Sequence, residues 1–242
     1  VLFIVLFALL VYSPLAHWSW HPEGFLAKMG AWDFAGGTVV HITAGCAALA
    51  GAMVLKRRKS HIERKEIPPA NVPYVLIGTG LLWFGWFGFN AGSALGSNGL
   101  AVQALGTTTV AAAAAGMAWV FLDKILGHKL SAMGACIGVV VGLVAITPAA
   151  GFVSIPHGMF IGAFASIVSN LVVRSFHKGK IDDALDVFAC HGVGGMVGML
   201  LTGVFASKSI NSVVGDNQGL IFGDATLFIN QLIAMIVVSI FA

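Results

Sequence analysis

DFAGGTVVHITAG, residues 33–45, and DVFACHGVGG, residues 186–195, each place an aspartate ahead of a histidine in an otherwise apolar stretch. In a helix that rises 1.5 Å per residue, His41 would lie about 12 Å beyond Asp33. That depth is near the middle of an apolar layer about 30 Å thick. His191 would lie at a comparable depth in its own segment. Ionisable residues are costly there and mark functional sites.

The composition indicates that lipid surrounds most of this chain. Of its 242 residues, 58% are hydrophobic and only 10% are charged, whereas soluble domains carry roughly 25% charged residues. This scarcity excludes a soluble enzyme, a coiled coil and a disordered chain. The net charge of +3 is too small to indicate nucleic-acid binding. Cys46, Cys136 and Cys190 lie in apolar stretches without paired spacing, which predicts core packing and neither a disulfide nor a metal site.

Eight apolar segments are candidates for membrane-spanning helices. A span needs about 20 apolar residues, and the first and last candidates reach the ends of the chain, so we expect a fragment truncated at both ends. The fold class predicted is an all-α, polytopic transmembrane bundle forming a single domain over 1–242. The segments are 1–16, 32–55, 71–95, 99–122, 131–148, 153–173, 184–206 and 225–242.

Basic residues alternate between the connecting loops and predict the topology. Eleven of the 13 Lys and Arg residues fall in the loops 56–70, 123–130 and 174–183. Positive charge is retained on the cytoplasmic side of membrane proteins. The loop 56–70 is therefore expected in the cytoplasm, and the loop 17–31, which holds Trp18 and Trp20, is expected outside the cell membrane.

The two histidine segments are the second and seventh in order, so they are expected to run in opposite directions. An aspartate-then-histidine helix repeated in inverted orientation is typical of transporters built from inverted repeats, whose sites lie near the midplane. A lone buried histidine would more simply bond to a backbone carbonyl. Two histidines at this depth, in a chain with few other buried charges, favour a functional site.

One face of the third predicted helix is apolar and aromatic and ends in a polar residue. Leu82, Trp86, Phe89 and Ser93 are spaced by four, three and four residues, so they share a helical face. Ser93 would lie nearest the outer surface, with the aromatic rings below it and Leu82 towards the middle. The face could line a conduit, or it could be an ordinary packing face or an aromatic belt.

Four stretches together resemble the ammonium transporter family (Amt/Mep/Rh), and its Amt branch in particular. They are DFAGGTVVHI, GWFGFNAGSA, TPAAGFV and DVFACHGVGG. The resemblance implies about eleven helices in two inverted five-helix halves plus a last helix, and places this chain from the fourth helix to within the eleventh. It also implies transport of ammonium or ammonia, with methylammonium as an analogue. We expect no enzyme activity, cofactor or metal, because the sequence has no nucleophile–base motif, no phosphate-binding glycine loop and no HExxH-type metal spacing.

The resemblance also implies roles for individual residues. Ammonium would be recruited at the outer mouth, deprotonated, and conducted as ammonia past a pair of imidazoles. Asp33 would be structural and electrostatic near the outer site, and Trp18 could substitute for Trp20, because HWSWHPEGF departs from the glycine-rich form expected there. The roles are recruitment by Trp20 and Ser93, a gate at Phe89, and a pore lined by His41, His191, Trp86, Leu82 and Val187.

Partners and alternatives follow from the same resemblance. It implies a homotrimer with one pore per subunit in the lipid bilayer, and a PII-type regulator at the cytoplasmic face. An Rh-like channel for ammonia or carbon dioxide and an ammonium sensor with an added cytoplasmic domain stay open as alternatives.

Overall fold

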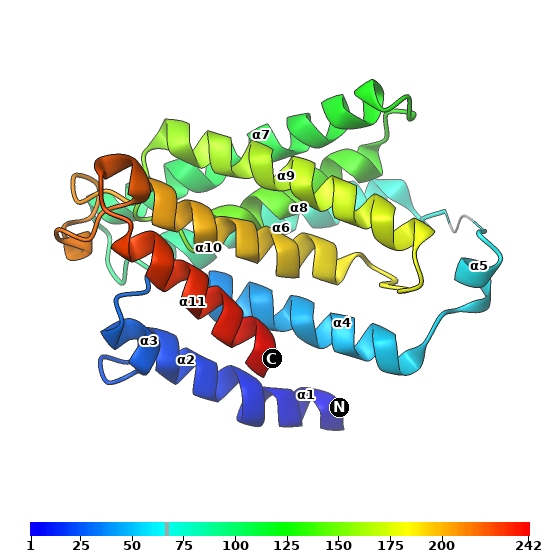
Figure 1. Cartoon of the computed structure of the whole chain (residues 1–242). Helices are drawn as coiled ribbons and strands as arrows, with labels where there is room; N and C mark the ends of the chain where they lie inside the picture. Colours follow the sequence, from blue (N-terminus) through cyan, green and yellow to red (C-terminus); the bar gives the residue numbers. More distant parts are fainter. Residues whose placement is uncertain (66–67) are drawn as a thin grey trace.

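The computed structural model describes residues 1–65 and 68–242, and within them it is helical and without strands. The helices form a bundle with their axes roughly along one direction (Figure 1). The elements are α1 (Leu2–Phe7), η1 (Ala8–Tyr12), α2 (Ser13–Trp20), α3 (Phe25–Lys28), η2 (Gly37–Ile42), α4 (Thr43–Leu55), α5 (Lys59–Ile62), α6 (Val72–Gly92), α7 (Gly99–Ile125), α8 (Ala132–Ile146), α9 (Ile155–Lys178), η3 (Phe188–Val193), α10 (Gly194–Phe205), η4 (Ser212–Val214), η5 (Leu220–Phe222) and α11 (Thr226–Phe241).

Each of the eight predicted segments contains a helix. Among the described residues, six helical stretches are long and apolar enough to cross a membrane, and two shorter apolar helices, α8 and α11, occupy the fifth and eighth predicted segments. These findings confirm the predicted fold class of a polytopic helical membrane protein.

Several predicted boundaries are wrong. The sixth helix does not end at residue 173: α9 continues to Lys178, so Arg174 and Lys178 lie on a helix and not in a loop. The first helix does not end at residue 16: α2 continues to Trp20, so Trp18 and Trp20 lie on a helix and not in a loop. The second helical segment begins at Gly37 and not at residue 32, because Asp33 folds back and bonds to the first backbone N–H groups of the helix.

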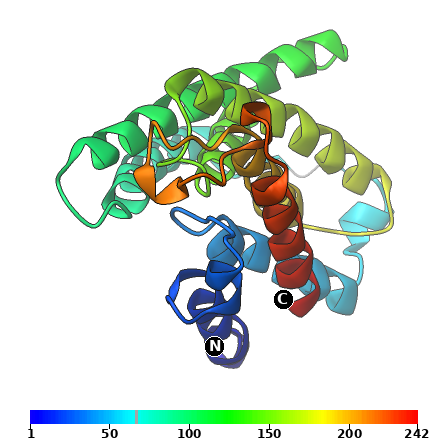
Figure 2. The ribbon, with the colours of Figure 1, turned by 60° about the vertical axis from the view of Figure 1, so that its left-hand side comes forward.

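Small residues allow the helices to approach closely, as the abundance of glycine predicts for a membrane bundle. A Cβ atom added at Gly142 of α8 would lie 2.5 Å from the carbonyl oxygen of Ala111 on α7, and one added at Gly162 of α9 would lie 2.2 Å from the same oxygen. The α7, α8 and α9 helices therefore pack backbone against backbone, and they form one side of the bundle (Figure 2).

The described segments that hold most of the basic residues lie at the same end of the bundle, the end where α5 is found (Figure 1). There the Arg58 guanidinium bonds to the Asp182 carboxylate, with Nη2 2.7 Å from Oδ1 and Nε 2.9 Å from Oδ2. Arg64 donates to the carbonyl oxygens of His177 and Lys178 at the end of α9, at 2.7 Å each. The loop after α4 is thus tied to the loop after α9.

Candidate functional site

His41 and His191 meet at the crossing of the two predicted inverted segments. Their Nδ1 atoms lie 3.2 Å apart, which is hydrogen-bonding distance, and their ring centroids are 5.4 Å apart. His41 is buried, with 2% of its surface exposed, and His191 is partly buried. Residues 150 positions apart in the sequence therefore form one imidazole pair.

Both histidines lie on π-helical turns, η2 and η3. Such turns are rare and often occur at functional sites. In η2, both Val40 and His41 direct their N–H groups to the carbonyl oxygen of Gly36, at 2.9 Å and 3.1 Å. Because His41 bonds to the carbonyl five residues before it and not four, the side chains on either side of this turn are rotated relative to those of a regular α-helix.

Glycines after each histidine allow the two segments to touch. A Cβ atom added at Gly45 would lie 2.3 Å from the backbone of Gly192, and one added at Gly195 would lie 3.2 Å from the Cβ atom of His41. Larger side chains at these positions would push the segments apart. The small residues that follow both histidines in the sequence are therefore what brings the rings together.

The aromatic residues of α6 cover His41. The indole of Trp86 stacks on the imidazole, with centroids 5.3 Å apart and an interplanar angle of 11°, and the ring of Phe89 is tilted, with its centroid 5.9 Å away. Trp86 is buried and Phe89 is 38% exposed. The predicted face of the third segment thus places Trp86 and Phe89 against His41.

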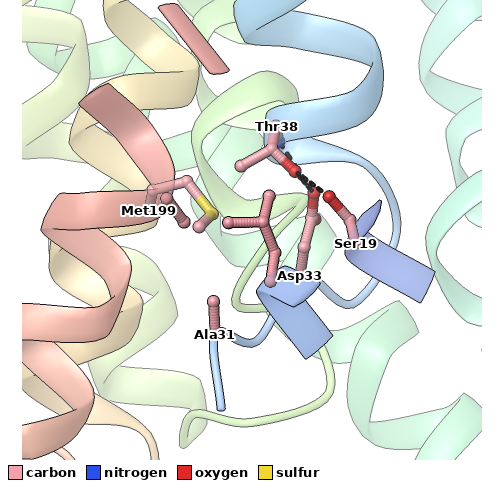
Figure 3. A pocket seen from close by; sticks show the side chains of 7 residues that line it. Ser19, Ala31, Asp33, Thr38 and Met199 are labelled. Carbon is pink, nitrogen blue, oxygen red and sulfur yellow. Dashed lines mark hydrogen bonds between the residues drawn. The ribbon is translucent and has the colours of Figure 1, made fainter. Parts of the chain in front are cut away.

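The Asp33 carboxylate is fully engaged at the start of η2. Its Oδ1 accepts the N–H groups of Gly36 and Gly37 at 2.8 Å and 2.7 Å, and its Oδ2 accepts the N–H group of Thr38 at 2.7 Å together with the Thr38 hydroxyl. Figure 3 shows Asp33 and Thr38 turned towards each other beside Ser19 and Met199. The space between these side chains is too small for a water molecule, so Asp33 holds the helix start and offers no free oxygen to a ligand there.

Trp20 lies beside Asp33, and Trp18 does not. The indole N–H of Trp20 donates to the carbonyl oxygen of Asp33 at 2.9 Å, and the Trp20 side chain is 43% exposed. Trp18 instead packs against Phe25 and Phe241, with ring centroids 5.0 Å and 4.6 Å away. Of the two predicted candidates, Trp20 is therefore the one joined to the start of the histidine segment.

The predicted roles of three further residues stay predictions. These residues are Ser93, Leu82 and Val187. Ser93 ends α6, and its hydroxyl donates to the carbonyl oxygen of Phe89 at 2.9 Å. Leu82 is one turn before Trp86 and 45% exposed. Val187 directly precedes η3, four residues before His191.

Known proteins are similar to this chain in sequence and in fold. The model of the "Ammonium Transporter Family" matches residues 1–242 of the chain. The chain belongs to the ammonium transporter family. An ammonium transporter of Aquifex aeolicus is 49% identical over 100% of this chain and 55% of its own length.

Solved structures are also similar to this chain. Saccharomyces cerevisiae Mep2 has a TM-score of 0.90 and 37% identity, covering 99% of this chain and 55% of that one. A structure titled "Sensor Amt Protein" has a TM-score of 0.83 and 29% identity, covering 98% and 60%. The chain thus spans a little over half the length of these proteins. Its family is one of membrane transporters and not of enzymes.

One residue beside the histidine pair was missed by sequence reasoning. Thr147, at the end of α8, places its hydroxyl 3.2 Å from Nε2 of His41 and 3.1 Å from the indole nitrogen of Trp86. The available signal was a polar residue directly before Pro148 at the end of a long apolar run. In the part of the chain that the structure describes, no three His, Cys, Asp or Glu side chains gather as they would around a metal ion.

Proposed function

We propose that residues 1–242 act as one transmembrane domain that conducts ammonia derived from ammonium past His41 and His191. The observation that carries the proposal is the imidazole pair, whose Nδ1 atoms lie 3.2 Å apart on two segments brought together from distant parts of the sequence. Neutral imidazoles can donate from one nitrogen and accept at the other. A narrow apolar passage disfavours a bare cation, so a neutral amine that can exchange hydrogen bonds with these rings would pass more readily than potassium.

The surrounding residues support a recruitment and gating function on one side of the pair. Phe89 and Trp86 cover His41, and Ser93 ends the same helix one turn beyond Phe89. An indole face attracts a cation such as ammonium, and Trp20, which is partly exposed beside Asp33, could provide it. We infer that ammonium is recruited near Trp20 and Ser93, loses a proton, and passes Phe89 as ammonia into a pore that Leu82 and Val187 help to line.

The charge distribution supports an orientation in the cell membrane. The described segments that hold eleven of the 13 basic residues lie at one end of the bundle (Figure 1), and basic loops are retained in the cytoplasm. The loop 56–70 would then be cytoplasmic, and the loop 21–31 between α2 and the second segment would face out. A homotrimer with one pore per subunit, regulated by a PII-type protein on the cytoplasmic face, is part of the same proposal.

Methylammonium uptake by the full-length protein in proteoliposomes tests the proposal. Replacing both His41 and His191 by Ala should reduce uptake to background, because the apolar passage would have no hydrogen-bonding partner left for the amine. His128→Ala, at an exposed loop position, is the control and should transport like the wild type. Undiminished uptake in the double variant, insensitive to potassium, would contradict the proposal.

A sensor is the second candidate, because a structure titled "Sensor Amt Protein" shares the fold. A sensor would bind ammonium at the same outer site without sustained uptake. Measuring uptake and ammonium-evoked current on the same full-length preparation distinguishes the candidates: a current indicates electrogenic transport, uptake without current indicates a neutral channel of the Rh kind, and binding without either indicates a sensor.

A further inference from the structure

The hydroxyl of Thr147 has three hydrogen-bonding neighbours and only one proton. Its Oγ1 lies 2.8 Å from the carbonyl oxygen of Leu143, 3.1 Å from Nε1 of Trp86 and 3.2 Å from Nε2 of His41. A hydroxyl donates one hydrogen bond and accepts two. Since a carbonyl can only accept and an indole N–H can only donate, the protonation of His41 depends on where the hydroxyl proton goes.

The end of α8 decides where that proton goes. The backbone N–H of Thr147 bonds to the carbonyl oxygen of Val144 at 3.2 Å, so the carbonyl of Leu143 does not receive the N–H group four residues ahead that a continuing helix would supply. Leu143 is fully buried, and a buried carbonyl without a partner is costly. The Thr147 hydroxyl therefore donates to Leu143, which leaves its two lone pairs for Trp86 and His41.

The remaining bond assigns the tautomer of His41. Trp86 donates its indole N–H to one lone pair of the Thr147 oxygen, and the other lone pair faces Nε2 of His41, which must then carry a hydrogen. A neutral imidazole carries one N–H hydrogen, so Nδ1 of His41 is an acceptor. Its partner at 3.2 Å, Nδ1 of His191, must therefore be a donor.

The chain of bonds ends at Nε2 of His191, which carries no hydrogen in this arrangement. This atom bonds to no residue that the structure describes, and it is not among the buried polar atoms that lack a partner. It is thus the acceptor that the pair leaves open.

We propose that Thr147 is a positioning residue that sets the tautomers of both histidines, so that Nε2 of His191 accepts an N–H hydrogen bond from an ammonia molecule in the pore. The inference rests on the proposed function for its ligand. The assignment of the tautomers rests on the geometry alone. It gives the pair a direction: a donor held by Thr147 at one end and an open acceptor at the other.

Nitrogen NMR of histidine tests the tautomers directly. In the full-length protein with ¹⁵N-labelled histidine rings, with the His191 signals identified by their loss in His191→Ala, we expect a protonated Nδ1 and an unprotonated Nε2. Thr147→Val keeps the shape but removes the hydroxyl, and losing that one bond should change the ratio of the tautomers roughly ten-fold. Thr147→Ser keeps the hydroxyl and should keep the wild-type pattern.

Transport kinetics provide a second measurement, with every rate divided by the amount of folded protein in the proteoliposomes so that loss of folding cannot produce the difference. Thr147→Val should lower the maximal rate of methylammonium uptake by roughly ten-fold, the change expected for about one hydrogen bond, with little change in the half-saturating concentration, because recruitment occurs elsewhere. Thr147→Ser should restore the rate. Equal rates in all three proteins would overturn the functional part of the inference.

The outcomes separate this inference from the proposed function. A protonated Nε2 on His191 in the wild type overturns the inference even if uptake depends on both histidines. Wild-type protein that shows the expected tautomers but no uptake contradicts the proposed function and leaves the assignment intact. If Thr147→Val does not fold, the spectra of the wild type and of Thr147→Ser still decide.

Discussion

Each of the two histidine segments begins with an aspartate that accepts backbone N–H groups, but different contacts hold the two segments in place. In each, an aspartate eight residues before the histidine is 8% exposed and accepts backbone N–H groups where the helix begins. Asp33 accepts three N–H groups and a hydroxyl. Its counterpart accepts one N–H group, that of Phe188, at 2.6 Å.

That counterpart is Asp183, and not Asp186 as the sequence pattern suggested. Asp186 instead lies 2.9 Å from Nε2 of His177, and Asp182 is bonded to Arg58. The first segment is therefore held by its own helix start, whereas the second is held by charged contacts between loops. We expect the first to depend on internal packing and hydrogen bonds, and the second to respond to pH and salt.

The crossing that both segments share should be the most sensitive position. Gly45→Ala would place a Cβ atom 2.3 Å from the backbone of Gly192, and overpacking of this kind costs about 1–3 kcal/mol or more. We expect a loss of folded protein and of uptake. Gly51→Ala on the same helix meets no atom within 4 Å and should be neutral or slightly stabilising. Thermal unfolding in detergent compares the two, and equal stability would show that the segments can separate without cost.

The same substitution at the two aspartates should have unequal effects. In Asp33→Asn an amide nitrogen replaces one carboxylate oxygen. Whichever way the amide turns, its N–H groups face backbone N–H groups, either those of Gly36 and Gly37 or that of Thr38. We expect the free energy of unfolding to fall by about 2–3 kcal/mol. Asp183→Asn can turn its remaining oxygen towards Phe188 and should cost about 1 kcal/mol or less. Unfolding midpoints of the two variants measure the difference, and a larger loss for Asp183→Asn would reverse the comparison.

An effect smaller than that of Asp33→Asn is expected at the loop contact that secures the second segment. Hydrogen bonds from Arg58 lower the pKa of Asp182 to about 2, whereas a free aspartate has a pKa of about 3.9. Because the folded state has the lower pKa, this contribution is present above about pH 4 and is lost as the pH falls towards 2. Asp182→Asn should cost about 1–2 kcal/mol at neutral pH and show less acid sensitivity.

Asp216→Asn is the matched control for this contact. Asp216 lies 3.2 Å from Lys208 but its side chain is 99% exposed, and exposed ion pairs contribute about 0–1 kcal/mol. Unfolding measured between pH 2 and 7 should therefore distinguish the two asparagine variants. Identical curves would show that the loop contact does not stabilise the second segment.

Much of the fold could be predicted from the sequence because the constraints were local or compositional. A residue in lipid must be apolar or have its polar groups hydrogen-bonded, so runs of hydrophobic residues marked the helices. Because basic residues are retained on one side of the membrane, clusters of Lys and Arg marked one end of the bundle. The errors occurred at helix ends: Trp20 extends a helix, and Asp33 precedes one, because side-chain hydrogen bonds decide such boundaries and leave little trace in hydropathy.

The site was predictable in part for the same reason. His41 and His191 were conspicuous as ionisable residues inside apolar segments, and the spacing of Trp86 and Phe89 placed them on one helical face. Thr147 was not conspicuous, since a threonine at a helix end is ordinary. Its importance depends on a hydroxyl placed between α6, α8 and η2, which only the packing of three helices creates.

The sequence by itself therefore determined the membrane-spanning class, the order of the helices and the identity of the two histidines, because each follows from composition or periodicity along one segment. The tertiary structure decided that their Nδ1 atoms meet at 3.2 Å, that Asp183 and not Asp186 matches Asp33, and that Thr147 completes the network. The bonds of His41 to Thr147 and to His191 join segments more than 100 residues apart. The glycines at the crossing make the histidine contact possible, because a side chain there would hold the two backbones apart.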